Sequence, residues 1–173
     1  MTGIRKGLTK VEVALRWDPS PAGTPPHDLD LVAAVYDADA PQGPAAYLVH
    51  FANRSPDGTV TLDRDSRTGQ GFGYDEVMTL ELHRMDPRLR RVVIGVVIQG
   101  RDGKTFADIP GTGIRIRADH TDLVTDDLTT IPHATAATVA EFTRDDTGTW
   151  TLHAETRGHT TDPDHFPAAM GAA

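Results

Sequence analysis

The sequence predicts an all-β protein, a two-sheet β-sandwich of short antiparallel strands joined by long acidic loops. Three observations lead to this prediction. Apolar side chains alternate with polar ones in six separate segments, one further segment is apolar almost throughout, and turn-forming residues stand between the segments. Alternation with a period of two is typical of antiparallel strands that have one face in the core and one face in water.

The segments give the expected order of the strands. The alternating ones are VEVALRW (11–17), LDLVAAVYD (29–37), AYLVHFA (46–52), VMTLELH (77–83), GIRIRAD (113–119) and TWTLHAE (149–155). The apolar segment RVVIGVVIQ (91–99) predicts a central strand buried on both sides. TAATVAEFT (135–143) favours a strand over a helix, and DPRLRR (86–91) predicts a single helical turn. Asp-Gly at 57–58 and 102–103 and Pro-Gly at 110–111 supply turns between them.

The length of 173 residues suits one domain with a sizeable core. We expect this domain to span residues 1–158. The tail, 159–173, has two prolines and no apolar period, so we expect it to be disordered and dispensable. The Pro-rich stretch 19–28 is expected to be an exposed connection between strands.

Composition limits the partners. The chain has 25 acidic against 17 basic residues, a formal net charge of −8, which argues against nucleic acid or an anionic membrane as the main partner and is compatible with cation binding. The absence of cysteine excludes thiolate metal sites, disulfides and cysteine nucleophiles. No apolar run reaches the roughly 18 residues of a membrane span, and the N-terminus lacks the apolar core of a signal peptide, so we expect a cytoplasmic protein without membrane insertion.

Catalytic patterns are weak, and we expect no enzyme activity. The three serines do not stand in a Gly-flanked nucleophile turn, and the eight histidines are not paired at metal-ligand spacing. There is no phosphate loop and no dinucleotide-binding fingerprint. One alternative stays open, a hydrolase that uses clustered carboxylates. A pocket holding two carboxylates with a raised pKa would favour it.

Oxygen-rich cation binding has more support. The loop 63–76 combines four acids with three glycines that free the backbone; they are Asp63, Asp65, Asp75, Glu76, Gly69, Gly71 and Gly73. Calcium prefers six to eight oxygen ligands on chain that can wrap around it. Asp28 and Asp30 are expected on one face of a strand start, where they repel each other unless a positive charge lies nearby.

An EF-hand does not explain this loop. Asp65 and Glu76 stand at the first and twelfth positions of a twelve-residue span, but Arg67 takes an expected ligand position and Gln70 replaces the turn glycine. Strands rather than helices are expected on both sides of the loop.

Five segments taken in order resemble the TerD family of bacterial tellurium-resistance and stress proteins. They are GLTKVEVALRWD (7–18), HDLDLVAAVYD (27–37), SPDGTV (55–60), DSRTGQGFGYDE (65–76) and residues 135–158. The resemblance implies a β-sandwich that binds calcium through its acidic loops, with a role in tellurite resistance and stress tolerance. Carried over position by position, it implies metal ligands at Asp28, Asp30, Asp65, Asp75 and Glu76.

The chain departs from the family pattern in its loop. Ser66 stands for the usual Asn, His27 for a Phe, and Phe72 and Tyr74 for two aspartates. Because two acids are lost, we predict a single calcium site, weaker than in members with the full acidic loop. The two aromatic side chains offer an alternative, since by packing on the sandwich they would hold the loop closed without an ion.

The family's first β segment is almost absent, because only Met1 to Lys6 remain before the first strand. We therefore expect an uncovered strand edge, which leads either to a homodimer through that edge or to a blunting Pro or Lys.

The leading interpretation is a cytoplasmic, non-enzymatic calcium-binding β-sandwich of TerD type that acts in the stress response, with the calcium ion and other stress-response proteins as its partners. The alternative is a degenerate family member that binds no metal and acts as a protein-interaction module.

Overall fold

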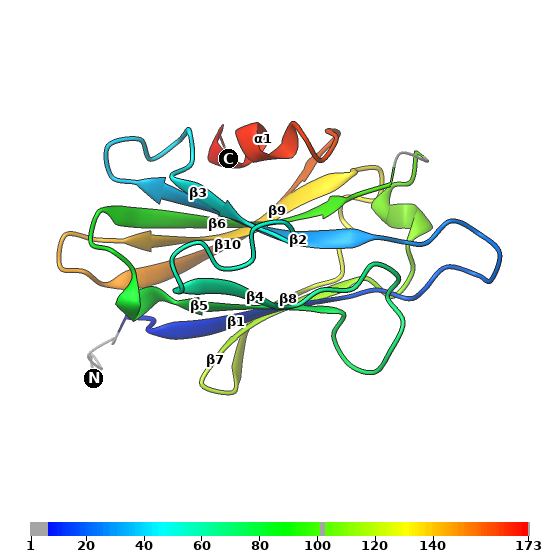
Figure 1. The fold of residues 1–173 in the computed structure, drawn as a ribbon, viewed down its shortest axis with the longest axis horizontal. Coiled ribbons are helices and arrows are strands. Elements are labelled where there is room, and N and C mark those ends of the chain that lie inside the picture. Colours follow the sequence, from blue (N-terminus) through cyan, green and yellow to red (C-terminus); the bar gives the residue numbers. More distant parts are fainter. Residues whose placement is uncertain (1–6, 101–102, 173) are drawn as a thin grey trace.

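The structure, a computed structural model, describes residues 7–100 and 103–172. Two five-stranded antiparallel sheets lie face to face (Figure 1). The first contains β4 (Val60–Arg64), β5 (Glu76–Glu81), β1 (Lys10–Arg16), β7 (Gly113–Ala118) and β8 (Thr121–Asp126), in that spatial order. The second contains β10 (Trp150–His159), β9 (Ala136–Arg144), β6 (Leu89–Ile98), β2 (Leu29–Asp37) and β3 (Tyr47–Val49). The predicted all-β sandwich is confirmed.

The main core fills the space between the sheets, as the alternating pattern requires. In β1, Val11, Val13 and Leu15 are buried, and across the ladder Val13 lies opposite Met78 of β5. The central position predicted for 91–99 is also correct, since β6 pairs with β2 on one side and β9 on the other.

β2 differs from its predicted pattern because both of its faces are buried. Leu29 and Leu31 belong to the main core, whereas Val32 and Ala34 belong to a second apolar cluster on the other face of the sheet. A strand with one wet face was expected from alternation alone, so something must cover the second face.

The cover is the C-terminal helix α1 (Phe166–Ala172), which lies across the outside of the second sheet (Figure 1). Phe166 and Met170 are fully buried there. The expectation of a disordered, undocked tail is therefore wrong for residues 159–172, and Ala173 lies outside the described residues. β10 continues to His159, and two apolar side chains spaced i, i+4 dock a helix that is too short to show a period in the sequence.

A close contact at one end of α1 and hydrogen bonds at the other end hold the helix on the sheet. Gly95 of β6 lies under Phe166, and a Cβ added to it would stand 2.5 Å from Phe166 Cζ. At the other end of the helix, the Arg91 guanidinium donates to the carbonyl oxygens of Gly171 and Pro41 at 3.0 and 2.8 Å.

Short elements were predicted less well. The helical turn expected at 86–91 is wrong, because Leu89 already starts β6; 3₁₀ turns lie instead at Leu82–Arg84 and Phe106–Asp108. β8, which pairs with β7 to complete the first sheet, was not predicted.

The expectation of an uncovered edge concerns Met1 to Lys6, which lie outside the described residues. β1 itself is paired on both sides, with β5 and β7. β10 is an edge strand, and Leu8 N donates to Trp150 O at its start. The register of β10 shifts between Ala154 and Arg157, an irregularity that blunts an edge. Dimerisation through an edge stays a prediction.

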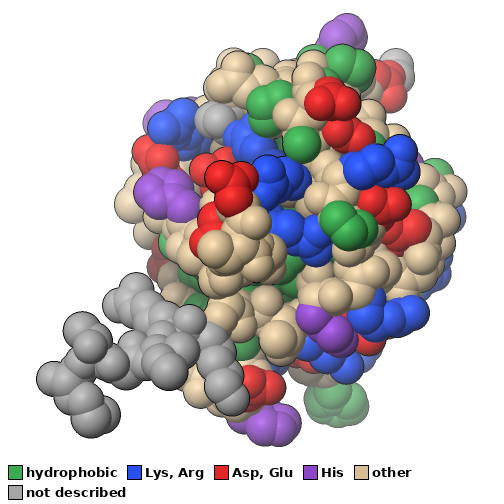
Figure 2. Space-filling view, turned by 90° about the vertical axis from the view of Figure 1, so that its left-hand side faces the viewer, with side chains coloured by type: hydrophobic (Ala, Val, Ile, Leu, Met, Phe, Trp, Pro, Cys, Tyr) green, Lys and Arg blue, Asp and Glu red, His purple; other side chains and the backbone are tan. Residues whose placement is uncertain are grey.

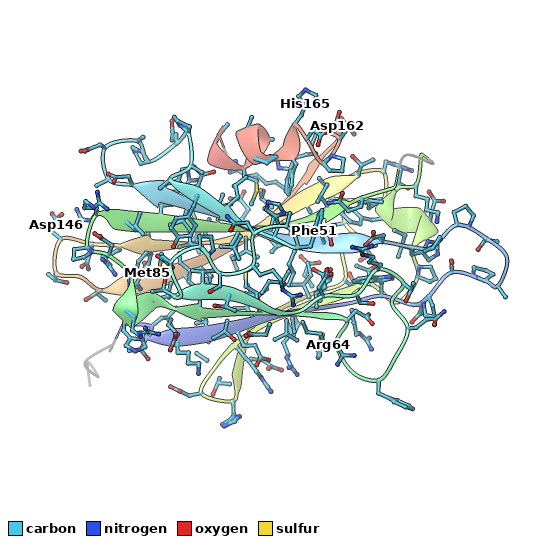
Figure 3. The ribbon with its side chains drawn as sticks, viewed as in Figure 1. Phe51, Arg64, Met85, Asp146, Asp162 and His165 are labelled. Atoms are coloured by element: carbon cyan, nitrogen blue, oxygen red, sulfur yellow. The ribbon has the colours of Figure 1, made fainter. Side chains whose placement is uncertain are left out.

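Figure 2 shows the left-hand end of the molecule in Figure 1, where basic and acidic side chains are interleaved. Asp146, labelled at this end in Figure 3, forms an ion pair with Arg90.

Candidate metal centre

Three acids from both sheets converge at the end of the sandwich where the long loops 18–28 and 65–75 project (Figure 1). Asp30 lies in β2, Asp65 follows β4, and Glu76 is the first residue of β5. Each offers a carboxylate oxygen, and these oxygens all lie within 4.8 Å of one another. We call Asp30, Asp65 and Glu76 the carboxylate cluster. Arg64, labelled in Figure 3, ends β4 and marks the base of the second loop.

Local strand pairing explains the position of Glu76. β3 pairs only with Ala33–Val35 of β2, so the preceding edge of β2 lacks a strand partner. The Leu31 N–H donates instead to Glu76 Oε1 at 2.8 Å. A side chain of the first sheet thus accepts a hydrogen bond from a backbone N–H at the edge of the second sheet.

The other carboxylate oxygens are the unusual feature of the site. Asp30 Oδ2, Asp65 Oδ1 and Glu76 Oε2, together with Asp28 Oδ1, are buried and have no hydrogen-bond partner among the described residues. Glu76 is fully buried and Asp30 is 3% exposed. Burying a carboxylate without a partner is unfavourable by several kcal/mol, about the whole margin of a domain's stability. These four oxygens therefore require a cation or protons.

Burial and mutual repulsion shift the pKa values of Asp28, Asp30 and Glu76. Burial is the main cause that raises the pKa of Asp28, to about 6, and the charge of Asp65 adds to it. Burial likewise raises the pKa of Asp30 and of Glu76, and the negative charges of their neighbours raise both further. A divalent cation would reverse this balance, because an opposite charge favours the ionised carboxylate.

The structure does not bring all five acids predicted from the sequence together in the carboxylate cluster. Asp30, Asp65 and Glu76 form the cluster, and Asp28 lies beside it, half-buried and coupled by charge to Asp65 and Asp30. Asp75 is not brought into the cluster. Its Oδ2 accepts the backbone N–H of Trp17 at 2.9 Å, so this carboxylate fixes the end of the loop to β1.

Two residues near the cluster were not predicted from the sequence. Gln99 follows β6; its backbone N–H donates to Asp28 O at 2.9 Å, and its side-chain amide hydrogen-bonds Asp30, which lowers the pKa of that acid. Trp17 donates from Nε1 to His27 O at 2.7 Å and packs under Gly69 of the loop. A polar residue that ends a buried strand, as Gln99 does, is the signal that sequence reasoning could have used.

The aromatic residues that replace two aspartates behave differently from each other. Tyr74 packs on the sandwich, with the Arg115 guanidinium 4.4 Å from its ring centroid. Phe72 does not pack, because it is 97% exposed.

These features define a two-sheet β-sandwich with a buried carboxylate centre suited to a hard cation. The family is shown by comparison, since the TerD domain model matches residues 1–164, and the chain belongs to the TerD domain family.

Two curated relatives and one solved structure illustrate the range of similarity. The chain is 29% identical over 127 residues to "Tellurium resistance protein TerD" of Alcaligenes sp, which covers 70% of this chain and 66% of the relative. It is 25% identical over 127 residues to "General stress protein 16U" of Bacillus subtilis, which covers 70% of this chain and 65% of the relative. The chain thus spans slightly less than two thirds of these relatives. A solved protein of Streptomyces coelicolor A3(2), described as a homologue of telluride resistance protein (TerD), is 49% identical, with a TM-score of 0.93 over 96% of this chain and 99% of that one.

Proposed function

We propose that the protein is a non-enzymatic calcium-binding stress protein, which holds one Ca²⁺ through the carboxylate cluster and Asp28. The observation that carries this proposal is the set of four buried carboxylate oxygens that find no hydrogen-bond partner in residues 7–100 and 103–172. They come from chain segments far apart in sequence, residues 28–30, 65 and 76, so the fold itself brings them together.

The donor chemistry supports calcium over softer metals. The gathered ligand atoms are carboxylate oxygens, and hard cations such as Ca²⁺ and Mg²⁺ prefer oxygen, whereas zinc sites favour imidazole and thiolate. Calcium tolerates irregular coordination and six to eight ligands, whereas Mg²⁺ demands near-ideal octahedral geometry. Loss of the two loop aspartates at Phe72 and Tyr74 supports one site, of lower affinity than a fully acidic loop would give.

A purely binding role is also favoured over the hydrolase alternative. Acids with raised pKa values are present, which is one half of the condition for that alternative. The other half is a pocket, and five surface cavities of the described residues are lined by residues other than these acids. Burial, with mutual repulsion added to it, accounts for the raised pKa values in a cation-binding cluster without a substrate. The names of the relatives support a place in tellurium resistance or the general stress response.

Calorimetric titration of metal-stripped protein with calcium tests the proposal. We expect one ion per chain, and at a hundredfold excess over the dissociation constant about 2.7 kcal/mol of added stability. Asp30→Asn should abolish most of this gain while leaving the metal-free protein at least as stable, because it removes a buried charge. Asp63→Asn is the matched control, since Asp63 lies outside the cluster, and its amide can still accept from the Thr79 hydroxyl.

Two results would contradict the proposal. A melting curve that saturating calcium does not move would leave the metal-free interaction module as the better description. A stoichiometry of two ions would refute the single site.

A further inference from the structure

We propose that the loop 65–75 is a calcium-dependent docking element for anionic lipid surfaces, with Phe72 as its anchor. The inference rests on the proposed function, because Asp65 opens this loop and Glu76 directly follows it, so both ends of the loop belong to the carboxylate cluster.

Phe72 has the largest exposed fraction of any large hydrophobic side chain among the described residues. It is 97% exposed, whereas the other exposed large hydrophobic residues, Phe51 and Leu123, are 42% and 40% exposed. Gly71 and Gly73 flank it with φ values of 117° and 78°, which side chains rarely adopt. A ring left in water gains about 1.5–3 kcal/mol when it is buried elsewhere.

The base of the loop is fixed although its tip is free. Ser66 Oγ accepts the Gly69 N–H at 3.1 Å, Gly69 lies against the Trp17 ring, and Asp75 is bonded to the Trp17 backbone. In the described chain no hydrogen bond involves residues 71–73. The anchor therefore stands on a preformed support, which lowers the entropy lost when it binds.

The surroundings of the tip fit a lipid surface better than a protein partner. A stable protein interface needs about 800 Å² from each partner. Within the loop itself Phe72 is the one exposed large hydrophobic residue among those described, since Phe51 lies in the turn after β3 and Leu123 lies in β8. A lipid interface accepts one amphipathic or aromatic side chain without a complementary surface. Arg64 Nη2 lies 3.4 Å from the position of a Cβ added to Gly71, and guanidinium groups bind phosphate headgroups well.

Charge makes the contact depend on calcium. The chain carries a net charge of −8, and the carboxylate cluster lies at the base of the loop, so an anionic surface repels the metal-free protein. A bound Ca²⁺ adds positive charge at this point, namely its own two charges less any protons that it displaces from the carboxyl groups. Because one ring and a few charges give only marginal membrane affinity, binding should be weak and reversible.

Co-sedimentation with vesicles tests the inference, using phosphatidylcholine alone and phosphatidylcholine mixed with phosphatidylglycerol, each with calcium or with a chelator. We expect the full chain to sediment only with the anionic vesicles in calcium. Phe72→Ala should reduce vesicle affinity about tenfold or more. Phe51→Ala, the matched exposed aromatic, should not change it, and both variants should bind calcium as the unchanged protein does.

Each outcome separates this inference from the proposed function, because calcium binding is titrated without vesicles. If calcium binds but the anionic vesicles capture no protein, or if Phe72→Ala binds them as well as the unchanged chain, the docking inference fails alone. Calcium-dependent self-association that Phe72→Ala removes, in the absence of vesicle binding, would assign the loop to a protein contact and overturn the lipid surface. If calcium does not bind, both proposals fail.

Discussion

The contact between Gly95 and Phe166 allows the docking of α1 to be tested by two substitutions that should compensate each other. A Cβ on Gly95 would lie 2.5 Å from Phe166 Cζ and 3.1 Å from Ala137 O. Gly95→Ala should therefore destabilise the protein by about 1–3 kcal/mol through overpacking. Phe166→Ala removes a fully buried ring and should cost about 3–5 kcal/mol.

The double variant should cost less than the sum of the two single variants. Without the ring, the new methyl group enters vacated space, and alanine in a strand is favoured over glycine by roughly 0.5–1 kcal/mol. The tight approach to Ala137 O remains and offsets part of this gain. In the Phe166→Ala background, Gly95→Ala should thus be neutral or slightly stabilising, a change of sign relative to the native background.

Urea denaturation of the four proteins at one pH measures the coupling. Gly113→Ala is the control, because its nearest neighbour is the flexible Arg16 side chain. We expect a coupling energy of at least about 1 kcal/mol, and a loss of roughly 6–20 °C in Tm for Phe166→Ala alone. Additivity within about 0.5 kcal/mol, or a cost below about 1 kcal/mol for Phe166→Ala, would show that the helix is not packed as described.

Three further predictions concern the end of the sandwich that holds the carboxylate cluster. Burial raises the pKa of Asp28 to about 6 and raises the pKa values of two cluster acids, Asp30 and Glu76, so the metal-free protein should be most stable near pH 4 and lose stability as the pH rises through 6. In chelator, Tm should fall between pH 5 and 8, and the part due to Asp28 should correspond to a free-energy loss on the order of 1 kcal/mol after allowance for its exposure. In calcium, Tm should not fall over this range. Gly69→Ala should lower the free energy of unfolding, measured by urea denaturation, by at least about 1 kcal/mol more than Gly73→Ala does. Both glycines have a positive φ, but only at Gly69 would a Cβ meet the Trp17 ring, at 2.5 Å. Equal losses would argue against that contact. Asp75→Asn should keep near-native calcium affinity in a calorimetric titration, since an amide oxygen can still accept the Trp17 N–H, and a loss as large as that of Asp30→Asn would place Asp75 among the ligands.

The candidate site was predictable as far as its residue types and neighbourhood, because charge repulsion is visible in the sequence. Two acids on one face of a strand start, as at Asp28 and Asp30, indicate a nearby positive charge whatever the fold. The resemblance then added Asp65, Asp75 and Glu76, but sequence position does not tell a ligand from a structural acceptor. Asp75 and Glu76 are neighbours in the chain and point to different partners, Trp17 N and the cluster.

The sequence by itself determined the sandwich and its central strand, because period-two alternation and the continuous apolar segment of β6 are local consequences of which faces are buried. Only the tertiary structure decided that β2 is buried on both faces, that α1 docks through Phe166 and Met170, and that three acids separated by up to 46 positions share one centre. The physical reason is the range of the interactions. Alternation depends only on residues that are neighbours in the sequence. The docking of α1 through two side chains and the shared carboxylate centre depend instead on which distant surfaces the fold brings together.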